Sequence, residues 1–189
     1  MPRAGKRPPG HFRIIAGRWR GRKIPILDQP GLRPTPDRVR ETLFNWLAPT
    51  LPGSDCLDLF AGAGALGLEA ASRGAARVVM VDHSRSAIEQ LAVNVARLEA
   101  DSAELVLSDA LAYLRGAPQP FDVVFLDPPY GVPLLEPALA LLVERWVTPE
   151  SRIYIEHAVE REPPELPEGW IYRRSKRTRQ VGYHLVQHR

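Results

Sequence analysis

The stretch that decides the fold is DLFAGAGALG at positions 58–67, which joins an expected strand to an expected helix. Gly62, Gly64 and Gly67 follow the pattern G-x-G-x-x-G, which is typical of a loop that holds a nucleotide cofactor. Glycine suits such a loop because the cofactor must press against bare backbone. A tight turn with close packing would explain the same glycines. The stretch therefore predicts an α/β fold with a ligand near the end of its first strand.

Short apolar runs alternate with amphipathic segments around that loop. Strands are expected at Asp55–Phe60, Arg77–Val81, Ala103–Leu107, Phe121–Leu126 and Arg152–Glu156. Helices are expected at Leu66–Ser72, Ser86–Leu98, Ala110–Leu114 and Leu134–Trp146. Ser86 and Glu89 predict a capping box at the start of the second of these helices. The alternation predicts a largely parallel, Rossmann-like sheet with right-handed crossovers, and Trp170–Gln187 predicts an antiparallel hairpin at one sheet edge.

The N-terminal part of the chain divides into three pieces by composition. Residues 1–10 are expected to be a disordered basic tail, and residues 11–31 a small basic hairpin extension. Residues 32–189 are expected to form the main domain. It would begin with a helix in which Thr35 is the N-cap and Pro36 the first helical residue. An apolar stripe at helical spacing predicts that this helix packs on the core; it comprises Val39, Leu43, Trp46 and Leu47.

The charge of the chain is distributed unevenly, although its net value is only +3. Residues 1–40 hold 11 Lys and Arg against two Asp and Glu, residues 41–168 hold eight against 20, and residues 169–189 hold six against none. Basic ends of this kind contact nucleic acid phosphates, or they keep the chain soluble as solvated tails. Interleaved aromatic residues favour the binding role. The best candidate RNA surface is Arg18, Trp19, Arg20, Arg22 and Lys23.

Several classes of protein are excluded by composition. At 189 residues, with 44% hydrophobic residues, the chain can bury a sizeable core, so wholesale disorder is excluded. No apolar run approaches the roughly 20 residues that span a bilayer, and no apolar stretch follows the basic N-terminus as in a secretory signal. Cys56 is the only cysteine, which excludes a disulfide framework and a cysteine-built zinc site. We expect a cytoplasmic protein without a membrane or metal partner.

Acidic residues stand at three successive strand ends. Asp58 precedes the glycine loop, Asp82 ends the second strand and Asp109 follows the third. In an open parallel sheet the carboxyl ends of the strands form the ligand-binding edge, and an acid at the position of Asp82 would hold ribose hydroxyls. An anionic Asp58 would repel a pyrophosphate but suits the cationic S-adenosylmethionine. The P-loop pattern G-x-x-x-x-G-K-[ST] does not occur, so a triphosphate site is unsupported.

The fourth expected strand runs into Asp127-Pro128-Pro129-Tyr130. Two prolines stop the strand and stiffen the loop, which by itself would suit a rigid turn with a packed tyrosine. The functional interpretation is more specific. The Asp127 carboxylate and the Pro128 carbonyl could accept both N–H groups of an exocyclic base amine, which would make its lone pair available for attack on a sulfonium methyl group. Tyr130 could stack on the base once it is flipped out of its helix.

At this point the sequence resembles the class I S-adenosylmethionine-dependent methyltransferases that act on amino nitrogens of nucleic acid bases. More closely, it is similar to the RsmD-type 16S rRNA guanine-N2 methyltransferases of bacteria. The motifs that carry the resemblance are RIIAG at 13–17, RPT at 33–35, DRVRETLFNWL at 37–47, the glycine loop and the 127–130 motif. Pro36 departs from the threonine or serine expected there.

The resemblance implies a seven-stranded sheet with an antiparallel last strand. It implies a base site at Asp127–Tyr130 and cofactor contacts at Asp58, Phe60, Gly62, Gly64, Gly67, Asp82, His83, Asp109 and Ala110. The substrate would be one guanine of 16S rRNA in the small ribosomal subunit or an assembly intermediate, bound by a monomer. Arg13, Arg38 and Arg177 join the expected RNA surface, and Arg38, Glu41 and Asn45 share one helix face toward the cofactor.

Two alternatives remain open at this stage. A DNA adenine-N6 or cytosine-N4 methyltransferase would use nearly the same Asp-Pro-Pro-Tyr chemistry, although a target-recognition domain would need more chain. A catalytically silent, RNA-binding protein of ribosome assembly would keep the fold and the basic surface. The complete glycine loop and Asp127 argue against that second alternative.

Overall fold

A computed structural model describes residues 10–26 and 35–189. Its main feature is a seven-stranded sheet in the order β5-β4-β3-β6-β7-β9-β8. The strands are β3 (Asp55–Asp58), β4 (Arg77–Asp82), β5 (Ala103–Leu107), β6 (Phe121–Leu126), β7 (Val147–Ala158), β8 (Trp170–Arg177) and β9 (Val181–His188). A separate two-stranded sheet pairs β1 (His11–Arg13) with β2 (Lys23–Pro25). The helices are α1 (Asp37–Leu47), α2 (Ala65–Ser72), α3 (Arg85–Leu98), α4 (Ala110–Leu114) and α5 (Leu135–Arg145).

The sheet has the topology that the sequence predicts. Strands β3 to β7 pair in parallel, whereas β9 lies between β7 and β8 and pairs antiparallel with both. The central strands β3, β4 and β6 are buried along almost their whole length, as expected where helices cover both faces of a parallel sheet. The Rossmann-like fold, with a seven-stranded sheet and an antiparallel last strand, is confirmed.

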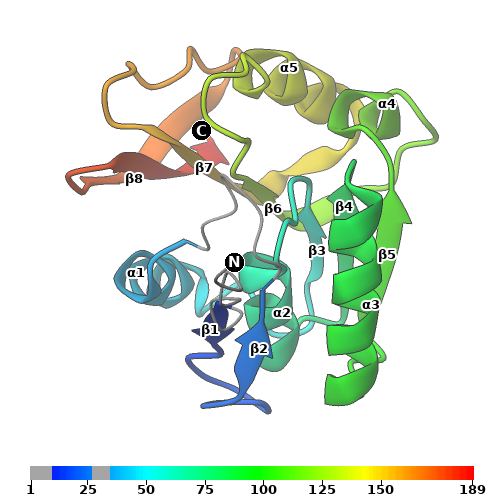
Figure 1. The fold of residues 1–189 in the computed structure, drawn as a ribbon. Helices are drawn as coiled ribbons and strands as arrows, with labels where there is room; N and C mark the ends of the chain where they lie inside the picture. Colours follow the sequence, from blue (N-terminus) through cyan, green and yellow to red (C-terminus); the bar gives the residue numbers. More distant parts are fainter. Residues whose placement is uncertain (1–9, 27–34) are drawn as a thin grey trace, which may run out of the picture.

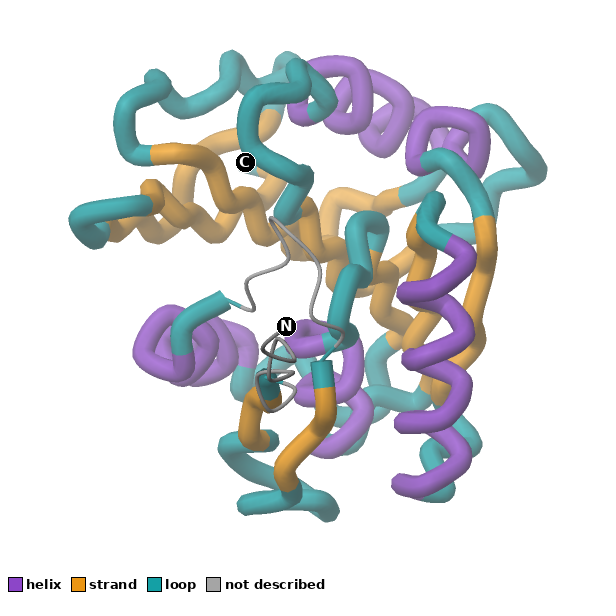
Figure 2. The backbone as a smooth tube through the Cα atoms, in the orientation of Figure 1, coloured by secondary structure: helices purple, strands orange, loops and turns teal. Residues whose placement is uncertain are grey.

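Helices cover both faces of this sheet (Figure 1). One apolar cluster joins the inner sides of α1, α2 and α3 to one face, and the other joins α4 and α5 to the opposite face. The β1–β2 hairpin lies beside α2 and away from α4 and α5 (Figure 2). Its apolar side chains belong to the first cluster; they are Phe12, Ile14, Trp19, Ile24 and Ile26. The hairpin is therefore packed on the same core as the sheet.

Two predicted helix caps are wrong. Ser84, not Ser86, caps α3, because the Ser84 hydroxyl accepts the backbone N–H of Ala87 at 3.3 Å. At the start of α1 no side chain caps the helix, and the hydroxyl of Thr35 is directed elsewhere. The strand limits also differ: β3 ends at Asp58, two residues early, and β7 extends over twelve residues. The predicted tail at residues 1–10, the end of the hairpin extension and the first residues of the main domain fall largely outside the described residues.

Candidate active site

A cleft of about 230 Å³ opens at the carboxyl ends of the central strands. Its walls come from four strand ends: Phe60 follows β3, Asp82 ends β4, Ser108 follows β5 and Pro129 follows β6. Parallel pairing places these four ends side by side, as the sequence predicts. The complete lining is Leu59, Phe60, Asp82, His83, Ser108, Asp109, Ala110, Pro129, Val132 and Leu134.

Asp82 organises one wall of this cleft. Its Oδ2 accepts the backbone N–H of Gly62 at 2.8 Å, and its Oδ1 accepts that of Ser84 at 2.8 Å. The carboxylate thereby ties the glycine loop to the loop between β4 and α3, while it still borders the cleft. His83 is largely exposed, and its Nδ1 lies 3.5 Å from Asp82 Oδ1. Both residues lie where a cofactor contact is expected.

Asp109 has a structural role in addition to its place in the cleft. Its Oδ1 accepts the N–H of Ala112 at 3.0 Å and so caps α4. Ala110 is buried behind it, and both residues line the cleft together with Phe60. The cleft therefore combines carboxylates that can accept hydroxyl hydrogen bonds with an apolar wall that suits a flat ring.

The three glycines of the loop have different reasons to be glycine. Gly62 and Gly64 have positive φ angles of 52° and 81°. A Cβ on Gly64 would lie 2.4 Å from Leu91 Cδ2, and one on Gly67 would lie 2.6 Å from Met80 Sδ. Close packing thus accounts for Gly64 and Gly67, and neither these two nor Gly62 lines the cleft. The alternative explanation of a tightly packed turn applies to two of the three glycines.

Asp58 lies beneath the glycine loop and does not line the cleft. It is 2% exposed, and its Oδ2 accepts the N–H of Gly67 at 2.9 Å. Burial, opposed by this hydrogen bond and increased by the charge of Asp82, raises the pKa of Asp58 to about 7. The expectation of a fixed negative charge beside the cofactor is therefore corrected: near neutral pH this carboxyl group is only partly ionised.

The loop after β6 holds the acid of the 127–130 motif. Asp127 is partly buried, and its Oδ2 accepts the hydroxyl of Thr35 at 3.2 Å. Burial, followed by the charges of Glu156 and Asp58, raises the pKa of the Asp127 carboxyl group well above its usual value. Pro128 is buried, whereas the ring of Tyr130 is 56% exposed. An acid of raised pKa next to an exposed aromatic ring is the arrangement expected for a base site.

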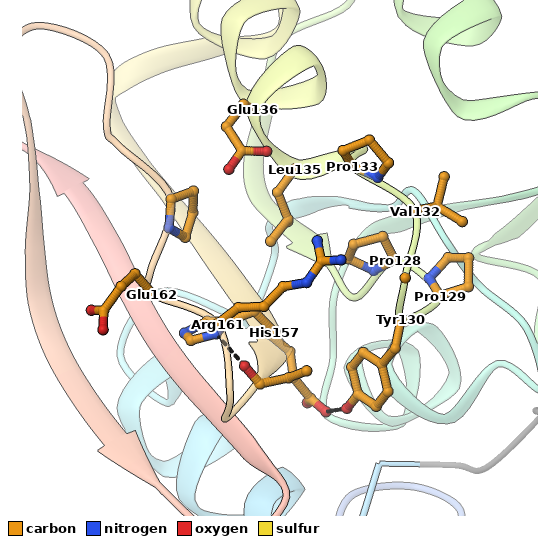
Figure 3. Close-up of a pocket in the computed structure, with 14 residues that line it drawn as sticks. Pro128, Pro129, Tyr130, Val132, Pro133, Leu135, Glu136, His157, Arg161 and Glu162 are labelled. Carbon is orange, nitrogen blue, oxygen red and sulfur yellow. Dashed lines mark hydrogen bonds between the residues drawn. The ribbon is translucent and has the colours of Figure 1, made fainter.

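A second, open pocket borders the same loop (Figure 3). Pro129 and Val132 line both this pocket and the cleft, so the loop separates the two. Opposite the loop lie Glu156 at the end of β7 and Arg161 beyond it. The hydroxyl of Tyr130 donates a hydrogen bond to Glu156 Oε1 at 3.0 Å across this pocket. The motif is thus connected to β7 as well as to the start of α1.

The expected RNA surface is exposed except at one residue. The basic side chains of the hairpin region are exposed, namely Arg13, Arg18, Arg20, Arg22 and Lys23, and so are Arg38 and Arg177. Trp19 is instead 5% exposed and packs in the core, with its backbone N–H bound to Ser72 Oγ. The prediction that the Trp19 ring lies on the RNA surface is wrong. The apolar residues of this basic segment serve packing.

Sequence reasoning missed the groups that anchor the hairpin. Glu69 is 0% exposed and accepts the backbone N–H groups of Ile15 and Ala16 at 2.8 and 3.0 Å. Arg40, also 0% exposed, donates to Glu69 and to the carbonyl oxygen of Arg13. Gly17 fits only as glycine because its Cβ would lie 1.8 Å from the carbonyl oxygen of Ser72. The sequence does contain one indication that Arg40 is buried, because Arg40 falls on the same helix face as the apolar residues Leu43 and Leu47.

Among residues 10–26 and 35–189, no group of three His, Cys, Asp or Glu side chains is arranged to hold a metal ion. Within the same residues no helix has the length and apolar character needed to cross a membrane.

Comparisons with known proteins give concordant results. A family model described as conserved hypothetical protein 95 matches residues 12–187. The chain is 49% identical over 179 residues to ribosomal RNA small subunit methyltransferase D of Escherichia coli strain K12, which covers 94% of this chain and 90% of that one. It is 47% identical over 184 residues to the protein of the same name from Haemophilus influenzae, with 94% of each chain covered. The solved yhhF protein of Escherichia coli superposes with a TM-score of 0.89, at 46% identity, over 95% of this chain and 98% of that one.

Proposed function

The chain belongs to the family described as conserved hypothetical protein 95, as do the ribosomal RNA small subunit methyltransferase D proteins, and we propose that it methylates 16S ribosomal RNA. More specifically, the methyl group comes from S-adenosylmethionine and its acceptor is the exocyclic N2 amine of one guanine. The substrate is the rRNA within the small subunit or an assembly intermediate, and the enzyme acts as a cytoplasmic monomer. The observation that carries the proposal is the cleft at the strand ends that meets the Asp127–Tyr130 loop.

The residues of the cleft fit S-adenosylmethionine, which supplies a sulfonium-bound methyl group when bound. Asp82 stands where it can accept ribose hydroxyls, and Phe60 and Ala110 offer an apolar wall for the adenine. Among the described residues that line the cleft there is no lysine or arginine, as expected for a cofactor without phosphate groups. The carboxyl groups of Asp82 and Asp109 line the cleft, where they suit a cationic ligand.

Asp127 and Pro128 are proposed to hold the target amine. The Asp127 carboxylate accepts one amine N–H and the Pro128 carbonyl the other, so that the nitrogen lone pair is free for attack. Methylation makes the amine cationic, and Asp127 then accepts its proton. The raised pKa of Asp127 suits this role because such a carboxyl group holds the proton at higher pH than an ordinary aspartate. The exposed Tyr130 ring stacks on the flipped base.

The exposed arginines are proposed to position the rRNA. Arg13, Arg18, Arg20, Arg22 and Lys23 surround the hairpin, and Arg38 and Arg177 extend the charge along α1 and β8. Contacts of this type bind phosphates and orient the substrate, whereas the base site decides which nucleotide reacts. The hairpin is fixed to α2 through Glu69 and Ser72, which gives the surface a defined position relative to the cleft.

The decisive experiment offers the protein several substrates with methyl-labelled S-adenosylmethionine. Unmethylated 30S particles, free 16S rRNA and duplex DNA are compared, and the product is digested and mapped by mass. The proposal expects label in one guanine of 16S rRNA, as N2-methylguanosine. Label in DNA adenine or cytosine would support a DNA methyltransferase instead. RNA binding without label in any substrate would favour a silent RNA-binding protein.

A further inference from the structure

The ring of Tyr130 is the exposed part of a hydrogen-bond chain that starts in the core. Its hydroxyl donates to Glu156 Oε1 at 3.0 Å, and the other carboxylate oxygen of Glu156 accepts the hydroxyl of Tyr154 at 2.7 Å. Glu156 is 2% exposed and Tyr154 is 0% exposed. The Tyr154 ring packs edge-on against Phe125 of β6, with 6.5 Å between ring centroids. A dashed line in Figure 3 marks the hydrogen bond of the Tyr130 hydroxyl, whose acceptor is Glu156.

We propose that Glu156 is a positioning residue, which holds the Tyr130 ring in the orientation that stacks on the target base. This inference rests on the proposed function, and it assigns to β7 a role in the base site that the Asp127–Tyr130 motif alone does not reveal. The buried Tyr154 fixes Glu156 in turn by its hydrogen bond. The position of the exposed Tyr130 ring is thereby set by the rigid centre of the sheet.

A carboxylate suits this position because it only accepts hydrogen bonds and has two oxygens for two hydroxyl donors. Burial and the nearby charges of Glu156 and Asp127 raise the pKa of Tyr130, which keeps its hydroxyl protonated and able to donate. Burial and the same two charges act likewise on the pKa of Tyr154. Both hydroxyl groups therefore stay protonated and can donate to Glu156.

The conformation of the loop explains why the Tyr130 ring needs a residue that fixes its orientation. Tyr130 is followed by Gly131, whose φ of 91° permits conformations that other residues avoid, and more than half of the tyrosine side chain is exposed. An aromatic ring in that situation would sample several rotamers, and only some of them stack on a base beside Asp127. A hydrogen bond to a buried carboxylate removes the unproductive orientations before the base arrives.

A purely structural role for Glu156 is less consistent with its surroundings. Its β9 neighbour is Tyr183, and within the described residues the Glu156 carboxylate forms no ion pair with Lys, Arg or His. Burying an unpaired carboxylate in a strand is costly, and an apolar side chain would satisfy the sheet better. The free-energy cost of burying this carboxylate is explained if Glu156 orients Tyr130 in the base site.

The test compares Tyr130→Phe, Glu156→Gln and the double variant on unmethylated 30S particles, after methylation by the unmodified protein has been established. Each single variant is expected to lower kcat about 10- to 100-fold, the range of one hydrogen bond to a charged group. KM for particles should stay within about twofold, because the basic surface docks the particle. The double variant should lose no more than the worse single variant, since both substitutions break the same bond.

Tyr172→Phe is the matched control, because it also deletes a hydrogen-bonded tyrosine hydroxyl, one that binds the Pro164 carbonyl. It should leave kcat unchanged. Unmodified kcat in Tyr130→Phe would overturn the inference even if Glu156→Gln failed to fold, because Tyr130→Phe changes only an exposed side chain. Multiplicative losses in the double variant would also overturn it. Absence of methylation by the unmodified protein would instead refute the proposed function, and this inference with it.

Discussion

Buried carboxylates occur in two parts of this molecule, and their partners differ. Where the hairpin meets α2, Glu69 is surrounded by donors: Arg40 lies 3.4 Å away, Arg73 lies 2.7 Å away, and two backbone N–H groups bind as well. At the carboxyl edge of the sheet, Asp58 and Glu156 are equally buried but accept only backbone or hydroxyl donors. Within the described residues neither they nor Asp127 forms an ion pair.

This difference in partners distinguishes a carboxylate that stabilises the fold from the carboxyl groups of the candidate active site. A buried carboxylate with two guanidinium partners holds one geometry and stabilises the fold. Buried carboxyl groups without a cation have raised pKa values, as the groups of Asp58, Asp127 and Glu156 do. Such groups hold their protons at higher pH than ordinary carboxyl groups do, which is typical of residues in a functional site. The two kinds of carboxylate should therefore respond differently to removal.

Asp127→Ala should give the largest effect on activity. We expect kcat to fall on the order of 10²- to 10⁴-fold, because the acceptor for the amine proton is removed. Stability should fall by no more than about 1–2 kcal/mol, because the hydrogen bond from Thr35 is lost but no ion pair is broken. Calorimetric affinity for S-adenosylmethionine should stay within several-fold. Asp122→Ala, which removes an exposed aspartate of β6, the strand before the loop, is the control. Undiminished turnover of Asp127→Ala would refute the assigned role.

Glu69→Ala should give the largest effect on stability. The substitution breaks the buried ion pair with Arg40, which among the described residues keeps only Asp37 as a carboxylate partner, and it leaves the N–H groups of Ile15 and Ala16 without their acceptor. Breaking a buried ion pair typically costs about 3–5 kcal/mol. Urea unfolding followed by circular dichroism measures this cost. Glu104→Ala breaks the Arg77 pair, whose Glu104 side chain is 54% exposed, and should cost no more than about 1 kcal/mol. Equal costs for the two variants would contradict the distinction between the two regions.

Asp58→Asn should remove a pH dependence of stability. The folded pKa of about 7 lies above the ordinary value of 3.8, so the folded state binds the proton more tightly. This group therefore stabilises the fold at low pH, and its contribution is lost as the pH rises from about 4 to about 7. Each pH unit of pKa difference corresponds to about 1.4 kcal/mol, so a change of a few kcal/mol is expected.

The measurement for Asp58 is the unfolding free energy at pH 5 and pH 8 in both proteins. Asp58→Asn should lose less stability between the two pH values than the unmodified protein. Parallel curves for Asp58→Asn and the unmodified protein would show that the Asp58 carboxyl group is not the source.

The fold and the strand-end residues of the cleft were predictable because they follow from local periodicity. Alternating strands and helices imply a parallel sheet, and a parallel sheet gathers Asp82, Asp109 and the Asp127 loop at one edge. Local periodicity could not show whether Gly64 and Gly67 serve the cofactor or close packing. The side chains that pack against them, Leu91 and Met80, belong to other elements. Contacts between distant segments leave no periodic signal.

The partners of the reaction residues were missed for the same reason. Thr35 lies before a proline, where a helix cap is the ordinary expectation, yet its hydroxyl contacts Asp127, 92 residues away. Glu156 looks like one residue of a buried strand, and nothing nearby in the sequence indicates Tyr130 as its partner. Trp19 sits among arginines, and a short irregular segment has no period that would distinguish a packed ring from an exposed one.

Replacing Arg18, Arg20 and Arg22 with glutamine should give the smallest effect, because exposed cations act on the substrate through screened interactions. Affinity for 16S rRNA, measured by filter binding, should fall, and its salt dependence should flatten by about 0.7 in the logarithmic slope for each phosphate that is no longer neutralised. Removing Arg115 and Arg145, exposed on the α4–α5 side, should leave the slope unchanged. An unaltered slope in the triple variant would indicate that the RNA binds instead at the β8–β9 hairpin around Arg177. The anchoring of the β1–β2 hairpin by Glu69 would then serve the fold alone.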